Sequence, residues 1–210
     1  MKHADALRIA QELVERLRPA CTRIEIAGSV RRGKPDVKDI EIVAVPDLTF
    51  PPVDRPVFGQ PAPKIYATKL DKLLAQFHDE GWLKREKIGP KYKKVLIDPQ
   101  KFGIELGGDS MFGGISLDLF LVTPPAEWGV LMAIRTGPAD FSHWCVTRQR
   151  NGGVMPNTHR CQDGAVWLGA TEEKHPDPST KLSMSEEIDF LKFLGLEWIE
   201  PGEREARWMK

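Results

Sequence analysis

Apolar residues along the first part of the chain recur at three- and four-residue steps, which is typical of helices with one buried face. Residues 4–18 follow this pattern until Pro19 ends it, and residues 69–81 repeat it up to Gly81. Three further helices are predicted over residues 127–135, 140–150 and 185–194. We expect Ser185 to cap the start of the last helix.

Alternating or short continuous apolar runs predict strands between these helices. Residues 39–45 alternate polar and apolar positions, and residues 115–122 form an apolar run in which Asp118 is the only charge. The other strand candidates are residues 23–27, residues 93–98 and short segments within 154–170. Loops rich in proline or glycine are predicted over residues 46–63 and 103–114, and a loop or a frayed turn over residues 30–36.

Strands and helices in this order predict an α+β fold. The character of the chain changes after Thr136-Gly137-Pro138, so we expect a division there. Residues 1–137 would form a domain with a mixed sheet backed by helices, and residues 138–210 a small C-terminal α/β subdomain. A chain of 210 residues is long enough to bury a core in this arrangement.

The charges balance overall but not along the chain. The 30 basic and 30 acidic residues give a formal net charge of zero, so any contact with nucleic acid must be local. Residues 1–137 hold 21 basic and 18 acidic side chains, and the segment Lys84–Lys94 is the most basic. Residues 1–137 therefore carry a formal charge of +3, and residues 138–210, with 9 basic and 12 acidic side chains, carry −3.

Cysteine usage and hydropathy indicate a protein of the cell interior. Cys21, Cys145 and Cys161 cannot all pair, and none lies in a CxxC motif, which favours a reducing compartment. The charged N-terminus does not resemble a signal peptide, and no run of about 18 apolar residues occurs. We expect a cytoplasmic or nucleoid-associated monomer with no membrane contact.

Three acidic side chains carry the candidate chemistry. Asp39 and Glu41 are two residues apart on a strand and so project from the same face. If the strand containing Asp118 is a neighbour, three carboxylates meet, and their repulsion favours a bound cation. Oxygen ligands suit two Mg²⁺ ions, or Mn²⁺, rather than zinc. The plainer alternatives are a solvated strand face for the pair and a salt bridge for Asp118.

The segment before these acids suits a phosphate group. Gly28 allows close approach of the backbone, Ser29 offers a hydroxyl donor, and Arg31 and Arg32 add guanidinium groups that match phosphate geometry. The alternative is an ordinary basic loop.

Other clusters have two readings. Lys91, Lys93 and Lys94 could follow a nucleic-acid backbone, or could protect an edge strand from aggregation, and Arg148 and Arg150 leave a similar choice. The two His-x-Cys pairs, His143 with Cys145 and His159 with Cys161, offer zinc ligands at an unsuitable spacing, and buried cysteines with surface histidines are the alternative.

The motif Gly28-Ser29-Val30-Arg31-Arg32-Gly33, followed by Asp39-x-Glu41, resembles the nucleotidyltransferase signature of the DNA polymerase beta family (family X). The ten-residue step from Ser29 to Asp39 agrees with it, and Thr136-Gly137 with Asp140-Phe141 resemble the turn after the palm. The ending at residues 185–204 resembles the family's last helix and tail. The resemblance covers residues 4–204 and is closest to the reduced form, palm plus C-terminal subdomain, of some viral polymerases.

This resemblance implies roles for named residues. Asp39, Glu41 and Asp118 would be the catalytic metal ligands, with Asp118 receiving the proton of the primer hydroxyl. The nucleotide-binding set would be Gly28, Ser29, Arg31, Arg32, Arg135, Thr136, Gly137, Asp140 and Phe141. The DNA-binding set would be Lys91, Lys93, Lys94, Arg148 and Arg150.

Four positions depart from the family pattern. Glu41 stands for the usual Asp, Ile134-Arg135 for an aromatic pair, Ser142 for an asparagine and Ser116 for a basic residue. The family's N-terminal lyase and helix-hairpin-helix segments are not expected in this sequence.

The resulting expectation is a minimal DNA polymerase for short-gap filling or repair. It would take a nucleoside triphosphate and a DNA primer-template or gapped DNA as partners. The alternatives are a nucleotidyltransferase that acts on RNA ends, a small molecule or a protein, and a non-catalytic nucleotide- or DNA-binding module.

Overall fold

The computed structural model describes residues 1–49, 68–104, 114–171 and 175–204, and no helix within these ranges is long and apolar enough to cross a membrane. The first half of the chain contains α1 (His3–Leu17), β1 (Cys21–Ile26), α2 (Gly28–Arg31), β2 (Asp39–Pro46), α3 (Lys69–Asp79), β3 (Leu83–Ile88) and β4 (Tyr92–Ile97). The second half contains β5 (Ile115–Leu121), α4 (Trp128–Thr136), α5 (Ala139–Val146), β6 (His159–Gln162), β7 (Ala165–Leu168), β8 (Lys181–Leu182) and α6 (Glu187–Phe193).

The larger sheet is mixed, as predicted. Its strand order is β1-β2-β5-β4-β3, and only β2 and β5 run parallel to each other. A smaller antiparallel sheet has the order β6-β7-β8. The parallel pair lies at the centre of the large sheet, so side chains from two distant segments of the sequence meet there.

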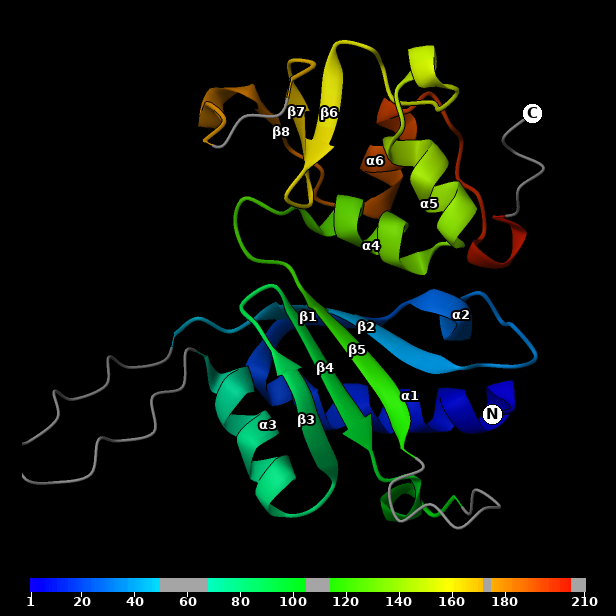
Figure 1. Cartoon of the computed structure of the whole chain (residues 1–210), viewed down its shortest axis with the longest axis vertical. Coiled ribbons are helices and arrows are strands. Elements are labelled where there is room, and N and C mark those ends of the chain that lie inside the picture. Colours follow the sequence, from blue (N-terminus) through cyan, green and yellow to red (C-terminus); the bar gives the residue numbers. More distant parts are fainter. Residues whose placement is uncertain (50–67, 105–113, 172–174, 205–210) are drawn as a thin grey trace, which may run out of the picture.

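One face of the large sheet packs against α1 and α3; in Figure 1, α1 runs behind the strands and α3 lies beside β3. Alternation along β2 buries Ile40, Ile42 and Ala44 on this side, and β5 contributes Leu117 and Leu119. Burial of these apolar side chains anchors both central strands. The polar positions of β2 and β5 therefore point to the other face.

The other face of the sheet turns toward the C-terminal helices, which lie above the strands in Figure 1. Helix α4 joins the two parts, because Trp128 and Met132 pack with β2 and β5 residues while Val130 and Ala133 pack with α5 and α6. The predicted division after residue 137 thus assigns α4 to the first domain, although this helix contributes side chains to the cores of both parts.

Most predicted elements are confirmed, with differences at their ends. The helix expected to reach residue 150 ends at Val146, and a short 3₁₀ turn covers Gln149–Asn151. Helix α6 begins after Glu186, not Ser185, because Glu186 and Asp189 form a reciprocal capping box. Strand β3 was not predicted, since its burial pattern exposes every residue after Leu83. The predicted loops at 46–63 and 103–114 lie mostly outside the described residues.

Candidate active site

The pairing of β2 with β5 brings the three predicted acids onto one face of the sheet. Glu41 lies directly opposite Asp118, and Asp39 lies opposite Ser116. All three acids are partly exposed, whereas Ile40, Leu117 and Leu119 between them are buried. The alternation that anchors these strands in the core therefore also presents the carboxylates to the opposite side.

The environment of Glu41 raises the pKa of its carboxyl group. Burial raises the pKa of its carboxyl to about 7, and repulsion from Asp39 and Asp118 adds to this, while Arg32 and Arg135 oppose it. Its side chain lies against Gly28, where an added Cβ would come within 1.9 Å of Glu41 Oε2. Gly28 also has φ of +61°, a conformation that favours glycine. The backbone of the predicted phosphate segment is thus in close contact with the acid cluster.

Asp118 is bound by a residue that sequence reasoning missed. The Tyr92 hydroxyl donates a hydrogen bond of 2.7 Å to Asp118 Oδ1. Burial, together with the nearby Asp118 carboxylate, raises the pKa of Tyr92 to about 12, so the phenol remains a proton donor at neutral pH. Tyr92 stands among three lysines in the sequence, and only the pairing of β4 with β5 brings it beside Asp118.

Ser29 and Arg32 lie beside the acids with unused hydrogen-bonding capacity. Within the described residues, Ser29 Oγ and Arg32 Nε are buried without a hydrogen-bond partner. Burial lowers the pKa of Arg32, and the charges of Glu41 and Asp39 oppose that change. Arg32 also donates from Nη1 to the Thr136 carbonyl. An anionic ligand would provide the acceptor that these two donors lack.

Arg31 has a different environment from Arg32. Its Nη2 donates to Glu187 Oε2 at 2.7 Å, and its Nη1 donates to Thr136 Oγ1 at 2.5 Å. The buried Glu187 also accepts from Arg204 Nη1 at 2.5 Å. The structure therefore engages Arg31 in a bridge between α2 and α6, and the expected nucleotide contact would require it to exchange these partners.

The predicted sugar and base contacts divide into two groups. Thr136 and Gly137 lie against the Arg31-Arg32 segment, and a Cβ at Gly137 would come within 2.8 Å of Arg32 Nη1. Asp140 is exposed at the start of α5. Phe141 is fully buried in the C-terminal core, which does not fit the expected nucleotide contact.

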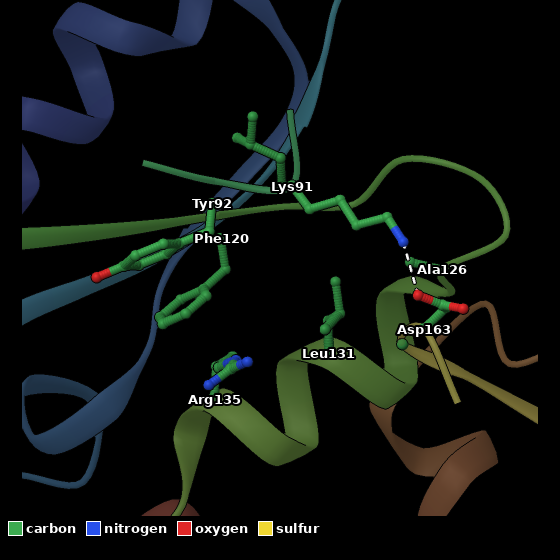
Figure 2. A pocket seen from close by; sticks show the side chains of 9 residues that line it. Lys91, Tyr92, Phe120, Ala126, Leu131, Arg135 and Asp163 are labelled. Atoms are coloured by element: carbon green, nitrogen blue, oxygen red, sulfur yellow. Dashed lines mark hydrogen bonds and ion pairs between the residues drawn. The ribbon is translucent and has the colours of Figure 1, made fainter. Parts of the chain in front are cut away.

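Arg135 lies over the ring of Phe120, 3.9 Å from its centroid (Figure 2), and interacts electrostatically with Glu41 and Asp118. The Tyr92 ring stacks on the same Phe120 at 5.2 Å between centroids. Burial lowers the pKa of Arg135, opposed by Glu41, Tyr92 and Asp118. These residues form one wall of a cavity of about 550 Å³ that lies between the sheet and α4.

The fold of this chain is similar to that of a solved structure of polymerase beta from Leishmania infantum, a ternary P/T complex. The TM-score is 0.66 at 17% sequence identity, and the match covers 98% of this chain and 77% of that chain. This chain has the polymerase beta-like fold. No protein-family model matches the sequence, and no curated protein matches it either.

On this fold, the predicted DNA-binding lysines do not share one surface. Lys93 points toward α3, where it is buried and pairs with Asp71 at 2.6 Å. Because strand neighbours point to opposite faces, Lys94 instead lies opposite Asp118 and is partly exposed. Lys91 pairs with Asp163 at 2.7 Å across the edge of the cavity (Figure 2). The buried position of Lys93 corrects its expected role as a nucleic-acid contact.

The two C-terminal arginines also differ. Arg148 is partly buried, and its Nε donates to the His159 carbonyl at 3.0 Å, so it holds β6 in place. Arg150 has an exposed side chain. In the part of the chain that the structure describes, the Arg150 side chain has no hydrogen bond or ion pair that would compete with a phosphate contact.

The donor set of the acid face suits a hard divalent cation, since it consists of carboxylate oxygens whose mutual repulsion a cation would relieve. As they stand, however, no three His, Cys, Asp or Glu side chains in the described ranges are close enough to share a metal ion. This applies equally to the His-x-Cys pairs, in which Cys145 is buried.

Proposed function

We propose that this chain is a minimal DNA polymerase that transfers a nucleoside monophosphate from a dNTP to a primer 3′-hydroxyl, with gapped DNA or a primer-template as substrate. The observation that carries the proposal is the register of β2 and β5, which places Glu41 opposite Asp118. Gly28 of α2 lies against the side chain of the same Glu41. On a chain with the polymerase beta-like fold, these contacts support a site in which the acids lie beside the segment that we propose binds phosphate.

The chain's own residues have distinct parts in this reaction. Ser29 Oγ and Arg32 would donate hydrogen bonds to the triphosphate. Ser29 Oγ and Arg32 Nε are buried and have no hydrogen-bond partner among the described residues, so both are available to a ligand. Asp39, Glu41 and Asp118 would hold two Mg²⁺ ions, or Mn²⁺. When bound, these ions supply positive charge to the attacking hydroxyl and to the leaving pyrophosphate.

The reaction itself exchanges one phosphoester bond for another. The primer oxygen forms a bond to the α-phosphorus of the dNTP, the bond from that phosphorus to the bridging oxygen breaks, and pyrophosphate leaves. Asp118 would accept the proton of the primer hydroxyl. Arg135, on α4, interacts electrostatically with Glu41 and Asp118. Its positive charge would reduce the repulsion between the substrate phosphates and these carboxylates.

The test is primer extension on a duplex with a one-nucleotide gap, with Mg²⁺ or Mn²⁺ and each dNTP supplied singly. We expect incorporation of the complementary nucleotide only, and loss of at least about 1,000-fold in rate for Asp118→Asn. Asp36→Asn is the matched control, because Asp36 is an exposed carboxylate that pairs with Lys2 outside the acid face.

Other outcomes have defined meanings. Extension that ignores the template would replace the polymerase with a terminal transferase. If neither metal supports extension, the DNA polymerase proposal is wrong, and RNA ends, small molecules and proteins become the acceptors to test. Equal activity of Asp118→Asn and the unaltered protein would remove Asp118 from the mechanism.

A further inference from the structure

Tyr92 is held in place by contacts on more than one side. Its ring stacks on Phe120 at 5.2 Å with an interplanar angle of 28°, and Lys87 Nζ lies 5.3 Å from the ring centroid. Phe120 is itself covered by Arg135, so three side chains from β4, β5 and α4 form a continuous stack (Figure 2). The orientation of the phenol is therefore determined by packing before any ligand binds.

This packing directs the Tyr92 hydroxyl to one oxygen of Asp118, at 2.7 Å. Tyr92 is only partly buried, so water could satisfy its hydroxyl, and the bond is not required to compensate for burial. Asp118 Oδ2 takes no part in the bond from Tyr92. A carboxylate that accepts a hydrogen bond on one oxygen is oriented to offer the other to a cation.

We propose that Tyr92 is a positioning residue for Asp118, the partner that orients this carboxylate for metal binding. The proposal rests on the proposed function, because it assumes that Asp118 is a metal ligand. Hydrogen-bond partners of metal ligands fix ligand orientation, and their loss commonly weakens metal affinity by about 10- to 100-fold. Tyr92 would therefore affect the metal step without touching substrate or the reacting atoms.

The experiment measures metal binding directly, without turnover. Free Mn²⁺ is titrated by electron paramagnetic resonance against the full chain, Tyr92→Phe, Asp118→Asn and the double variant. Tyr92→Phe keeps the ring stack and removes only the hydroxyl, so we expect Mn²⁺ affinity to fall about 10-fold while the metal-free unfolding temperature is nearly unchanged. In the Asp118→Asn background, Tyr92→Phe should have no further effect on affinity.

A spectroscopic readout tests the same contact independently. The sequence has two tyrosines, Tyr66 and Tyr92, so a Tyr66→Phe protein grown with 3-fluorotyrosine carries fluorine only at Tyr92. We expect its ¹⁹F resonance to shift when Mg²⁺ is added, and the shift to disappear with Asp118→Asn. This measurement also carries the test if Tyr92→Phe does not fold.

Several results would overturn the proposal, and they are distinguishable. Unchanged or tighter Mn²⁺ binding by Tyr92→Phe would remove Tyr92 alone and leave the proposed function standing. An equal loss of affinity in the Asp118→Asn background would show that Tyr92 acts elsewhere. If the unaltered chain binds no Mn²⁺, the metal part of the proposed function fails together with the role of Tyr92.

Discussion

Gly28 and Glu41 fit against each other only because residue 28 has no side chain. A Cβ at position 28 would meet Glu41 Oε2 at 1.9 Å and Glu41 Cβ at 2.9 Å, and the φ of +61° adds backbone strain. We expect Gly28→Ala to lower the free energy of unfolding by about 2 kcal/mol or more, and to displace the Glu41 carboxylate. Chemical denaturation measures the first effect, and Mn²⁺ affinity measures the second.

Gly33→Ala is the matched control for this substitution. Gly33 has φ of +68°, nearly that of Gly28, but a Cβ there would meet nothing within 4 Å. This variant should therefore show only the conformational cost of about 1 kcal/mol, with metal affinity retained. Equal losses in both variants would contradict the close contact between Gly28 and Glu41.

The ionisation of Glu41 links stability to pH. Its pKa of about 7 in the fold lies above its ordinary value of 4.5, mainly because of burial, so between these values the folded chain binds more protons than the unfolded chain. Stability is therefore lost as pH rises from about 4.5 to 7. Glu41→Gln should stabilise the metal-free protein by about 1–2 kcal/mol at pH 8, with little gain near pH 4.5. Denaturation at both pH values is the check, and an equal gain at each would mean that the effect is not ionisation.

At the scale of single residues, the sequence was sufficient to predict where the acidic side chains lie, but not which residues form hydrogen bonds with them. Alternation along 39–45 was enough to predict that Asp39 and Glu41 share a face, because strand geometry has a period of two. The hydrogen bond from Tyr92 to Asp118 depends on the order of strands in the sheet. Nothing local to residue 92 predicts which strand lies beside it, so this contact required the fold.

Helix α2 is held to α6 through one buried carboxylate. Glu187 accepts hydrogen bonds from both Arg31 and Arg204, and its side chain is 6% exposed. We expect Glu187→Gln to destabilise the protein by about 3–5 kcal/mol, because two guanidinium groups would lose their shared counter-charge. Urea denaturation measures the change.

Glu15→Gln provides the comparison for Glu187. Glu15 pairs with Arg18 at 2.9 Å on the surface of α1, with a side chain 69% exposed. Surface pairs of this kind contribute about 1 kcal/mol or less. A loss for Glu187→Gln no larger than that for Glu15→Gln would contradict the proposed anchoring of α2.

Elements with strong patterns were predictable, while those shaped by neighbours were not. The apolar stripe of residues 4–18 has a helical period, and α1 matches it closely. Strand β3 exposes Lys84 and Arg85, and forms because it can pair with β4. The capping box of Glu186 and Asp189 displaced the predicted Ser185 cap, since a reciprocal pair satisfies two backbone donors.

The whole molecule places the acid face between two cores. One core lies under the sheet with α1 and α3, and the other is built from α5, α6 and the small sheet. Helix α4 joins them and brings Arg135, Thr136 and Gly137 toward the acids. The sequence predicts two parts. Periodicity shows which face of a helix is buried, but it does not show what packs against that face. It was therefore not sufficient to predict that α4 contributes to both cores.

Because the net charge of the chain is zero, the proposed binding to DNA would depend on where its cations point. Lys93 and Lys94 are adjacent, yet the Lys93 side chain is 3% exposed beside Asp71, whereas that of Lys94 is 40% exposed on the acid face. Each phosphate that a lysine neutralises contributes about 0.9 to the slope of log affinity against log salt concentration. Lys94→Gln should therefore reduce this slope by up to about 0.9. The slope is measured by fluorescence anisotropy of a labelled gapped duplex at several salt concentrations.

Lys93→Gln is the matched control. It should leave the slope unchanged and instead lower the unfolding free energy by about 3 kcal/mol, because Asp71 loses its buried partner. A reduced slope for Lys93→Gln, or equal slopes for Lys94→Gln and the unaltered chain, would show that DNA does not approach from the acid face of the sheet.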